Sequence, residues 1–600
     1  MRHVFLTTNL SELHPSASTA STDDLLCASP FSDTALKVLR ARYFLRDNAG
    51  RPLEDASGML ARVARAVASP GRLFGDDTDF WEERFFERMQ RREFLPNSPT
   101  LMNAGLSNGQ LAACFVLPLQ DDLTSIFTAL THAARIHQTG GGTGFSFSAL
   151  RPAEDGVHST GGIASGPISF MELFDHATAV IRQGGRRRGA NMAVLRIDHP
   201  DIESFIKAKR TPGRLENFNL SVGVTDAFFK ALDTRTPFPL RNPRTGRVAR
   251  TVDAQELFDA MAEAAWAVGD PGLLFLDEIN RHNPTPELGR IETTNPCGEQ
   301  PLLAHESCTL GSLNLAAFCS GANVDWQILK GAIRDAVVFL DNVIEANCYP
   351  LPEIEAATRR TRKIGLGVMG FADLLTRLDI PYDSEAGLKL GGTIARFLTD
   401  QARSVSRELG EKRGSYPAFP SNGGLPCLRN ASVTCIAPTG TISLIAGVSS
   451  SIEPFFALAF ARHLLDGQRM IEVNPLLQAE LERLDATGED LLDTVRETGS
   501  LRHIKDLPED LRRRFPIALE IAPQWHVRMQ AAFQAHIDAA VSKTVNMPPD
   551  APVSAVHEVF NLARTLQLKG ITVYRYGSRT NQTLSLIEEE ARPDCRECAV

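Results

Sequence analysis

Short apolar runs alternate with helical segments along most of the 600-residue chain, and this alternation limits the folds that the chain can adopt. The apolar runs include ACFVLPL, MAVLRI, FNLSVGV, GLLFL and SVTCIAP, and the segments between them include LTSIFTALTHAARIHQ and AQELFDAMAEAAWAV. Uninterrupted apolar runs of this length are typical of strands buried on both faces, as in parallel sheets covered by helices. The sequence therefore predicts an α/β fold with largely parallel strands.

The two ends of the chain depart from this pattern. Residues 1–30 are rich in Ser, Thr and Asp without periodicity, so we expect them to be disordered. Residues 31–95 have helical apolar spacing, which predicts a small helical N-terminal region. Residues 96–577 carry the α/β pattern, whereas residues 578–600 lose it and become charged, which predicts a flexible tail.

Composition excludes several classes of function. A formal net charge of −9 argues against general nucleic-acid binding. No apolar run is long enough to span a membrane, and the N-terminus lacks the hydrophobic region of a signal peptide. Ten cysteines in 600 residues are too few for a disulfide scaffold. We expect a cytoplasmic protein that binds neither nucleic acid nor membranes.

The stretch IETTNPCGEQPLL, residues 291–303, holds an amide, a thiol and a carboxyl group at alternate positions, on Asn295, Cys297 and Glu299. In an extended chain, alternate side chains share one face, which predicts that the three groups project into one cavity. A hydrolytic cysteine protease would need a histidine to ionise the thiol, and the nearest one, His305, has no recognisable triad context. The trio instead suits a thiol that acts beside a polar, hydroxylated substrate.

Other cysteines differ in their setting. Cys308 follows Cys297 closely in the sequence, and Cys114 belongs to a distant apolar run. Cys595 and Cys598 form a C-x-x-C pair in the tail, which favours disulfide exchange over zinc binding because zinc needs four ligands and no second pair exists. The remaining cysteines are predicted to be packing residues: Cys27, Cys319, Cys348, Cys427 and Cys435.

Several glycine-containing segments could either contact phosphate groups or serve packing alone. Residues 138–152 and 182–195 are predicted to be glycine-rich loops that contact an anionic ligand rather than plain surface loops, the second with Arg186, Arg187 and Arg188. Residues 435–447, CIAPTGTISLIAG, suit a phosphate cradle or a plain helix N-cap equally well. Residues 364–370, IGLGVMG, match a dinucleotide fingerprint, but RRTRK precedes them instead of a buried strand, so close helix packing is favoured.

Taken together, these motifs resemble the catalytic subunit of ribonucleotide reductase, from about Leu36 to the C-terminus. The resemblance is carried, in this order, by LPNSPTLMNAG, GGGTGFSFSALRP, RRRGANMAVLRIDHPDIESFI, NPCGEQPL, SCTLGSLNL, RKIGLGVMGFADLL, APTGTISLIAG and AHIDAAVSKTVNMP. It implies a ten-stranded α/β barrel in which a finger loop carries the reactive cysteine through the centre.

The same resemblance implies a role for each reactive residue. Cys297 would hold a transient thiyl radical that takes the ribose 3′ hydrogen, Glu299 would accept the 3′-hydroxyl proton, and Asn295 would bind the ribose hydroxyls. Cys114 and Cys308 would supply two electrons and end as a disulfide. The tail pair, Cys595 and Cys598, would reduce that disulfide and be recharged by a thioredoxin- or glutaredoxin-like partner.

Binding sites are implied in the same way. The ribonucleotide substrate would contact Ser98, Ala113, Cys114, Gly142, Asn295, Glu299, Pro438, Thr439, Gly440, Thr441 and Ile442. A deoxynucleotide or ATP specificity effector would bind near Asp121 and Asp122 and act through the Arg186, Arg187 and Arg188 loop, in a homodimer. No metal ligands from protein side chains are expected.

The source of the radical divides the family. The late pair Tyr574 and Tyr576 is interrupted by Arg575, a poor match to the tyrosine relay of enzymes with a separate radical-generating metal subunit. The chain looks most like the adenosylcobalamin-dependent class acting on ribonucleoside diphosphates. The alternatives are a catalytic subunit that needs such a metal subunit, a triphosphate reductase, and a non-enzymatic nucleotide-binding or redox-sensing protein.

Overall fold

A computed structural model describes residues 31–157, 161–181, 189–420, 427–463, 469–484, 489–579 and 584–585. The predicted disordered N-terminus, the Arg186, Arg187 and Arg188 loop, Cys27 and the tail pair Cys595 and Cys598 lie outside the described residues.

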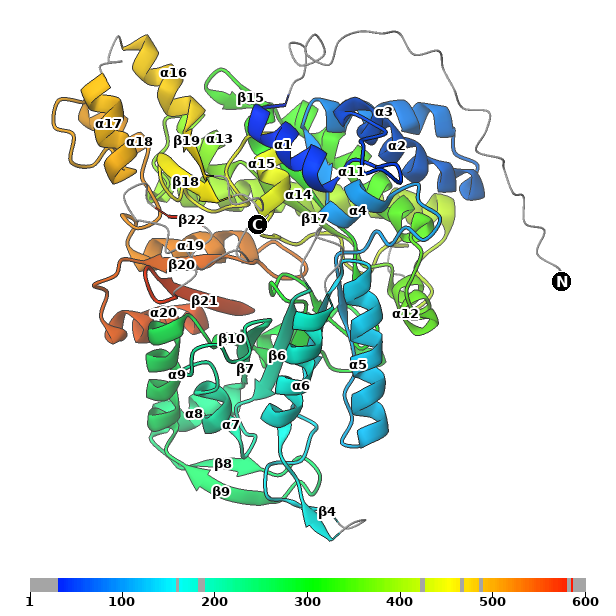
Figure 1. Cartoon of the computed structure of the whole chain (residues 1–600), viewed down its shortest axis with the longest axis vertical. Coiled ribbons are helices and arrows are strands. Elements are labelled where there is room, and N and C mark those ends of the chain that lie inside the picture. Colours follow the sequence, from blue (N-terminus) through cyan, green and yellow to red (C-terminus); the bar gives the residue numbers. More distant parts are fainter. Residues whose placement is uncertain are drawn as a thin grey trace.

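Short helices open the described chain, each started by a capping side chain. They are α1 (Asp33–Arg42), α2 (Ala56–Ala68), α3 (Thr78–Gln90) and α4 (Ser98–Asn103). The side chains of Ser32, Asp55, Asp77 and Asn97 each accept a hydrogen bond from a first-turn backbone N–H. Helices α2 and α3 pack against the long helix α11 (Trp326–Ala346), as Figure 1 shows. The N-terminal region is helical, as predicted.

The largest sheet has the strand order β13-β2-β3-β6-β7-β10-β21-β20. Strands β2 (Cys114–Val116), β3 (Gly142–Ser146), β6 (Asn191–Arg196), β7 (Phe218–Val224) and β10 (Gly272–Phe275) pair in parallel. Strand β21 (Gly570–Arg575) is antiparallel to β10 and parallel to β20 (Thr544–Met547). At the other edge, β13 (Ser307–Cys308) is antiparallel to β2.

Further backbone hydrogen bonds link β20, at one edge of this sheet, to β13 at the other edge, so that the strands form a ring. The N–H of Ser542 donates to Ile436 O at 2.9 Å, which joins the β20 segment to residues 434–436. The N–H of Cys435 donates to Leu366 O at 3.2 Å, which reaches β17 (Gly365–Met369). Strand β17 is parallel to β14 (Leu310–Asn314), and Thr309 connects β14 to β13. With β13 and β14 counted as one strand, the ring has ten members, which agrees with the predicted barrel.

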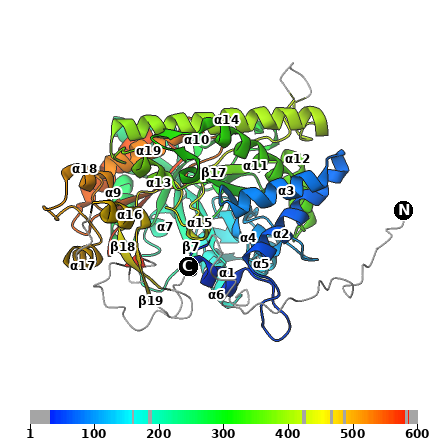
Figure 2. The same ribbon diagram turned by 90° about the horizontal axis from the view of Figure 1, so that it is seen from above.

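Helices surround this ring. Helices α5 (Leu123–Gln138) and α6 (Pro167–Val180) pack together on one side, and α9 (Ala254–Val268) packs against α20 (Val553–Thr565) on another (Figure 1). Helix α14 (Glu385–Arg413) crosses the molecule and contacts α11 and α19 (Pro523–Gln534), as Figure 2 shows. None of the described helices is long and apolar enough to cross a membrane.

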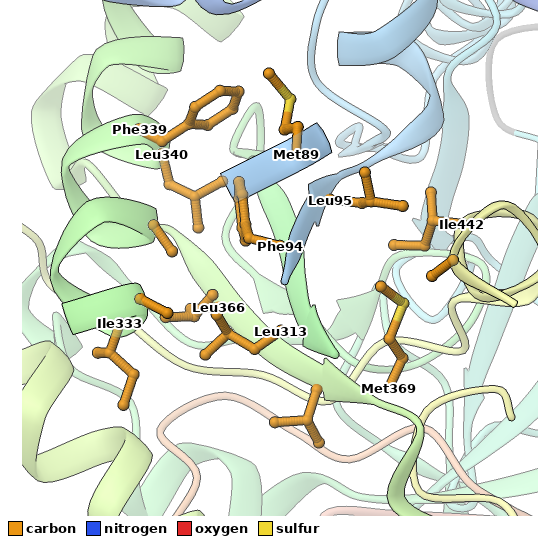
Figure 3. Close-up of a cluster of buried hydrophobic side chains, with 14 of the residues drawn as sticks. Met89, Phe94, Leu95, Leu313, Ile333, Phe339, Leu340, Leu366, Met369 and Ile442 are labelled. Carbon is orange, nitrogen blue, oxygen red and sulfur yellow. The ribbon is translucent and has the colours of Figure 1, made fainter. Parts of the chain in front are cut away.

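A buried cluster of apolar side chains lies between α11 and the β1-β14-β17 sheet. Strand β1 (Phe94–Pro96) contributes Phe94, which contacts Phe339 edge to face with ring centroids 5.2 Å apart. Leu313 of β14 and Leu366 of β17 belong to the same cluster (Figure 3). Burial of these side chains stabilises the packing of the N-terminal helices on the barrel, by about 25 cal/mol per Å² of buried apolar surface.

Shorter elements complete the described chain. They are η2 (Ser69–Phe74), β4 (Gly156–Val157), β5 (Gly162–Ile163), α7 (Ile202–Ile206), α8 (Asp226–Thr234), β8 (Phe238–Arg241), β9 (Val248–Val252), α10 (Leu276–Arg281), η3 (Pro286–Leu288), β11 (Thr293–Thr294), β12 (Pro301–Leu302), η4 (Leu315–Phe318), β15 (Cys319–Ser320), β16 (Asn323–Val324), α12 (Pro352–Thr361), α13 (Phe371–Arg377), α15 (Gly440–Ala446), β18 (Ala459–His463), β19 (Arg469–Val473), α16 (Pro475–Arg483), α17 (Glu489–Thr498), α18 (Glu509–Arg514) and β22 (Leu584–Ser585).

Candidate active site

The reactive stretch is a hairpin turn, so the alternation of side chains in an extended chain does not apply to it. Strands β11 and β12 pair antiparallel, and residues 295–300 reverse the chain between them. The N–H of Gly298 donates to Asn295 O at 3.1 Å, and the N–H of Gln300 donates to the Asn295 side-chain oxygen at 3.0 Å. Gly298 has a φ of +83°, a conformation that glycine adopts most readily. The turn therefore positions the three reactive groups differently from a strand.

This finger turn runs against the inner face of the barrel, and glycines make room for it. A Cβ on Gly144 of β3 would lie 1.8 Å from Thr294 O, and one on Gly142 would lie 2.8 Å from Pro296 Cγ. The side chain of Asn219 on β7 donates to Pro296 O at 2.8 Å. Gly142 and Gly144 thus belong to a buried strand that admits the finger turn, so their assignment to a loop is wrong, whereas the contact of Gly142 with substrate stays a prediction.

The glycines of IGLGVMG have a similar purpose. Gly365 and Gly367 lie within the buried strand β17, where added Cβ atoms would meet Gln300 Nε2 at 2.4 Å and Cys435 O at 2.5 Å. The predicted reason, close packing, is right, but the packing partners are a neighbouring strand segment and the finger turn rather than a helix.

Burial separates the three reactive groups. Asn295 and Glu299 are buried, whereas Cys297 is exposed and lines a cavity of about 520 Å³ together with Pro296, Gly298 and Pro438. Residues of β7, β10, β20 and β21 also line this cavity. Cys297 therefore faces a partly open cavity of the size that holds small ligands.

Cys114 and Cys308 lie directly opposite each other on the antiparallel pair of β2 and β13. Opposed residues in such a pair have Cα atoms about 4.5 or 5.5 Å apart, within the range that a disulfide spans. Burial, a hydrogen bond with Cys114 and the nearby Glu299 carboxylate raise the pKa of the Cys308 thiol well above its usual value. The structure thus brings Cys114, Cys308 and Glu299 together.

A third buried thiol joins this pair. Cys435 shares one apolar cluster with Ala113, Cys114 and Cys308, and burial with the nearby Glu299 raises its pKa well above the usual value. The sequence predicts Cys435 to be a packing residue. Its position at the start of CIAPTG, next to the predicted phosphate cradle, was the feature that could have indicated a place near the active site. Of the other cysteines assigned to packing, Cys348 is exposed, which corrects that prediction, whereas Cys319 and Cys427 are half-buried.

The cradle at residues 438–442 includes the start of α15, a helix that contacts β1. Thr439 has a φ of +57° and makes no side-chain cap to α15; instead its hydroxyl accepts a hydrogen bond from Ser451 N at 2.7 Å. The plain N-cap interpretation is therefore wrong. Gly440 is exposed, whereas Ile442 packs in the core cluster of Figure 3 and holds α15 against that core. Ser98 follows β1, which contacts α15, and its hydroxyl lies 2.7 Å from Tyr43 OH.

The predicted effector residues lie at the start of α5. Asp122 caps that helix by accepting from Ser125 N at 2.9 Å, and Asp121 forms an ion pair with Arg151 at 2.8 Å. Both carboxylates thus have local structural partners on the outside of the barrel.

Comparison with known proteins places the chain in a family. Residues 112–425 and 425–574 match the family pattern described as "Ribonucleotide reductase, barrel domain", and residues 29–109 match "Ribonucleotide reductase, all-alpha domain". The chain belongs to the ribonucleotide reductase family.

Individual relatives cover nearly the whole chain of this ribonucleotide reductase. A "Vitamin B12-dependent ribonucleoside-diphosphate reductase" of Mycobacterium tuberculosis (strain CDC 1551 / Oshkosh) is 52% identical over 92% of this chain and 80% of its own. A protein of the same description from Thermoplasma acidophilum is 45% identical over 94% of this chain and 81% of its own. The solved structure of the Actinobacillus ureae class Id ribonucleotide reductase alpha subunit superposes with a TM-score of 0.76 at 23% identity, over 91% of this chain and 97% of its own. That last likeness supports the fold alone.

Proposed function

We propose that this chain reduces ribonucleoside diphosphates to 2′-deoxyribonucleoside diphosphates and uses adenosylcobalamin as its radical source. The observation that carries the proposal is the exposed Cys297 thiol on an enclosed finger turn, with two opposed thiols, Cys114 and Cys308, on the adjoining barrel wall. The names of the Mycobacterium tuberculosis and Thermoplasma acidophilum relatives support the diphosphate substrate and the cofactor.

The buried residues support a balanced reaction. A thiyl radical on Cys297 takes the 3′ hydrogen atom of the ribose, and Glu299 takes the 3′-hydroxyl proton as the 2′-hydroxyl leaves as water. One of the thiols of Cys114 and Cys308 supplies the proton with which the 2′-hydroxyl leaves as water, and the other supplies the hydrogen that C2′ gains. Their two electrons reduce the sugar as the two sulfurs form a disulfide, and Glu299 returns its proton to the 3′ oxygen. The 3′ hydrogen atom then returns from Cys297, which restores its thiyl radical. The raised pKa of Cys308 keeps that thiol protonated at neutral pH, as a hydrogen donor requires.

Asn295 has the orientation that its proposed role needs. Its side-chain oxygen accepts from the N–H of Gln300, which fixes the amide, and among the described residues its Nδ2 has no hydrogen-bond partner although it is fully buried. A buried donor without a partner is costly. A ribose hydroxyl of the substrate would satisfy it.

The cavity beside Cys297 fits part of the cofactor. Its volume of about 520 Å³ suits a nucleoside-sized group such as 5′-deoxyadenosyl. The buried Gln530 lines it; its Nε2 donates to Val541 O and Gly570 O, which leaves Oε1 without a donor in the described part of the chain. An amino or hydroxyl group of the cofactor would fill that role. Bound adenosylcobalamin supplies the radical chemistry that removes the hydrogen atom of the Cys297 thiol.

The chain offers little support for a tyrosine relay as the alternative. Tyr574 lines the Cys297 cavity, but the next residue, Arg575, turns outward and stacks on Trp266 at 4.1 Å. A radical path through adjacent tyrosines would meet an arginine at this position.

A homodimer with the effector at its interface is part of the proposal. Leu123 and Phe127, one turn apart on α5, are 64% and 50% exposed, and Val180 of the neighbouring α6 is 69% exposed. A second copy that covers this apolar face would bury these side chains. Asp122, at the start of α5, would then lie at the edge of the interface, where an effector deoxynucleotide or ATP could bind.

Recharging of the Cys114–Cys308 disulfide is assigned to the tail. Both thiols are buried, so a large reductase cannot reach them directly, whereas a tail thiol could enter the barrel. Cys595 and Cys598 would perform the exchange and be reduced by a thioredoxin- or glutaredoxin-like protein. A cytoplasmic location stays a prediction that fits this reducing chemistry.

Replacement of the finger thiol tests the proposed function. Cys297→Ser is expected to lower the rate of deoxynucleotide formation by at least about 10³-fold, because a hydroxyl does not form the radical, while nucleotide binding changes little. Product is measured by chromatography and binding by calorimetry. Residual turnover within tenfold of the wild type would overturn the radical role of Cys297.

A further inference from the structure

A second cavity, of about 640 Å³, lies at the other end of the same strands. The Cys297 cavity includes Asp270, just before β10, and Tyr574 near the end of β21. The second cavity includes Glu278, just after β10, and Lys569, just before β21. Because β10 and β21 are antiparallel, the two cavities lie at opposite ends of this strand pair. Nothing in the proposed reaction uses the second cavity.

A buried cation forms part of its wall. Lys569 is 5% exposed, and its ammonium group donates to Asp538 O at 2.7 Å and Ala539 O at 2.6 Å. An ammonium group has three donors, so one remains available within the described structure. Carbonyl oxygens are neutral, and the nearby Asp538 carboxylate is paired with Arg403. The cavity therefore offers a buried positive charge without a directly bonded carboxylate among the described residues.

Two polar side chains in the same wall lack partners in the described part of the chain. Ser432 is 6% exposed and its hydroxyl makes no hydrogen bond. Gln534 is 9% exposed; its Nε2 donates to Ile537 O and Ala539 O, which fixes the amide and leaves Oε1 without a donor. Buried polar atoms are almost always paired, so this wall is suited to a polar occupant that brings at least one donor.

The rim is supplied by one face of α14. Arg396, Asp400 and Arg403 follow at intervals of four and three residues and line the same cavity. Arg396 and Asp400 are exposed and make no ion pair or hydrogen bond within the described residues, although they are one turn apart. A guanidinium group is well suited to binding phosphate, and a carboxylate accepts hydrogen bonds from hydroxyl groups.

We propose that this cavity is a binding site for a small phosphorylated sugar or nucleotide, separate from the substrate and effector sites. The phosphate would bind Lys569, Ser432 and Arg396, and hydroxyl groups of the ligand would donate to Gln534 and Asp400. Water alone would satisfy Ser432 and Gln534, but it would leave Lys569 and Arg396 without a directly bonded anion among the described residues.

Hydrogen bonds also link the site to the segment that leads into the finger turn. Glu278 lies on α10, and the side chain of Asn280 on that helix holds both backbone groups of Ile291, at 2.9 Å each. Ile291 begins the stretch that carries Cys297. A ligand in the cavity would thus affect the position of the segment that leads into the finger turn.

Binding of ribose 5-phosphate to the full chain, measured by calorimetry, tests the proposal. Arg396→Gln is expected to weaken binding about tenfold or more, the usual cost of a lost charged hydrogen bond, and Ser432→Ala to weaken it less. Arg407→Gln is the matched control, since Arg407 is exposed on the same helix and does not line the cavity. Inorganic phosphate should bind more weakly than ribose 5-phosphate, because it lacks the sugar hydroxyls that would donate to Gln534.

Three results would overturn it: no saturable binding to the wild type, equal affinity of Arg396→Gln and wild type, or equal affinity for inorganic phosphate and ribose 5-phosphate. The measurement needs no cofactor, so its outcome is independent of the reductase activity.

Discussion

Single cysteines in this protein owe their chemistry to burial. Cys297 is exposed to a cavity, where a thiol can meet both a radical source and a substrate, whereas Cys308 and Cys435 are buried and held protonated. Glu299 contributes to both raised pKa values, since its negative charge disfavours a nearby thiolate. One carboxylate thus serves as a proposed base and also keeps its neighbouring thiols in the hydrogen-donor form.

This difference predicts the pH dependence of alkylation. Thiolates react and thiols do not, and a pKa well above 9 leaves almost no Cys308 thiolate at pH 8; the fraction rises only as the pH passes above 9. At pH 8, iodoacetamide is therefore expected to label Cys297 at least about tenfold faster than Cys308, as measured by peptide mass spectrometry. Equal labelling of the two at pH 8 would contradict the burial of Cys308.

At the scale of elements, the fit between the finger turn and strand β3 depends on glycine. Gly144→Ala places a methyl group 1.8 Å from Thr294 O, so the turn must move. We expect a loss of about 1–3 kcal/mol in the free energy of unfolding and a larger loss of activity. Gly156→Ala is the control, since a Cβ there meets nothing within 4 Å. Denaturant unfolding and turnover assays of both variants check this, and equal effects of the two would argue against a close-fitting turn.

Sequence patterns predicted the strands and helices better than the contacts between them. Buried runs such as MAVLRI and FNLSVGV became β6 and β7 because continuous apolar runs have few alternatives in an α/β fold. The role of the glycines in β3 and β17 was harder to predict from the sequence. A glycine that lets another backbone segment pack closely has the same local sequence pattern as a glycine in a loop. Cys435 joined the thiol cluster through the bridge from Thr434 to Leu366, a long-range contact that no local spacing encodes.

At the scale of the whole molecule, the exposed apolar face of α5 and α6 is the proposed interface of a homodimer. Phe127→Asp is expected to raise the dimer dissociation constant about 100-fold or more, because the new charge would be buried at the interface. Sedimentation velocity measures the change. Leu73→Asp, at an exposed apolar site outside that face, should leave the dimer intact. A Phe127→Asp protein that dimerises like the wild type would exclude α5 as the interface.

The most direct test of the proposed function is turnover by the purified chain alone. With a ribonucleoside diphosphate, a dithiol and adenosylcobalamin as the only further additions, we expect deoxyribonucleoside diphosphate to form, with none formed when adenosylcobalamin is omitted or when Cys297→Ser replaces the wild type. No turnover until a separate metal-bearing subunit is added would contradict the proposed radical source and point instead to a relay through Tyr574.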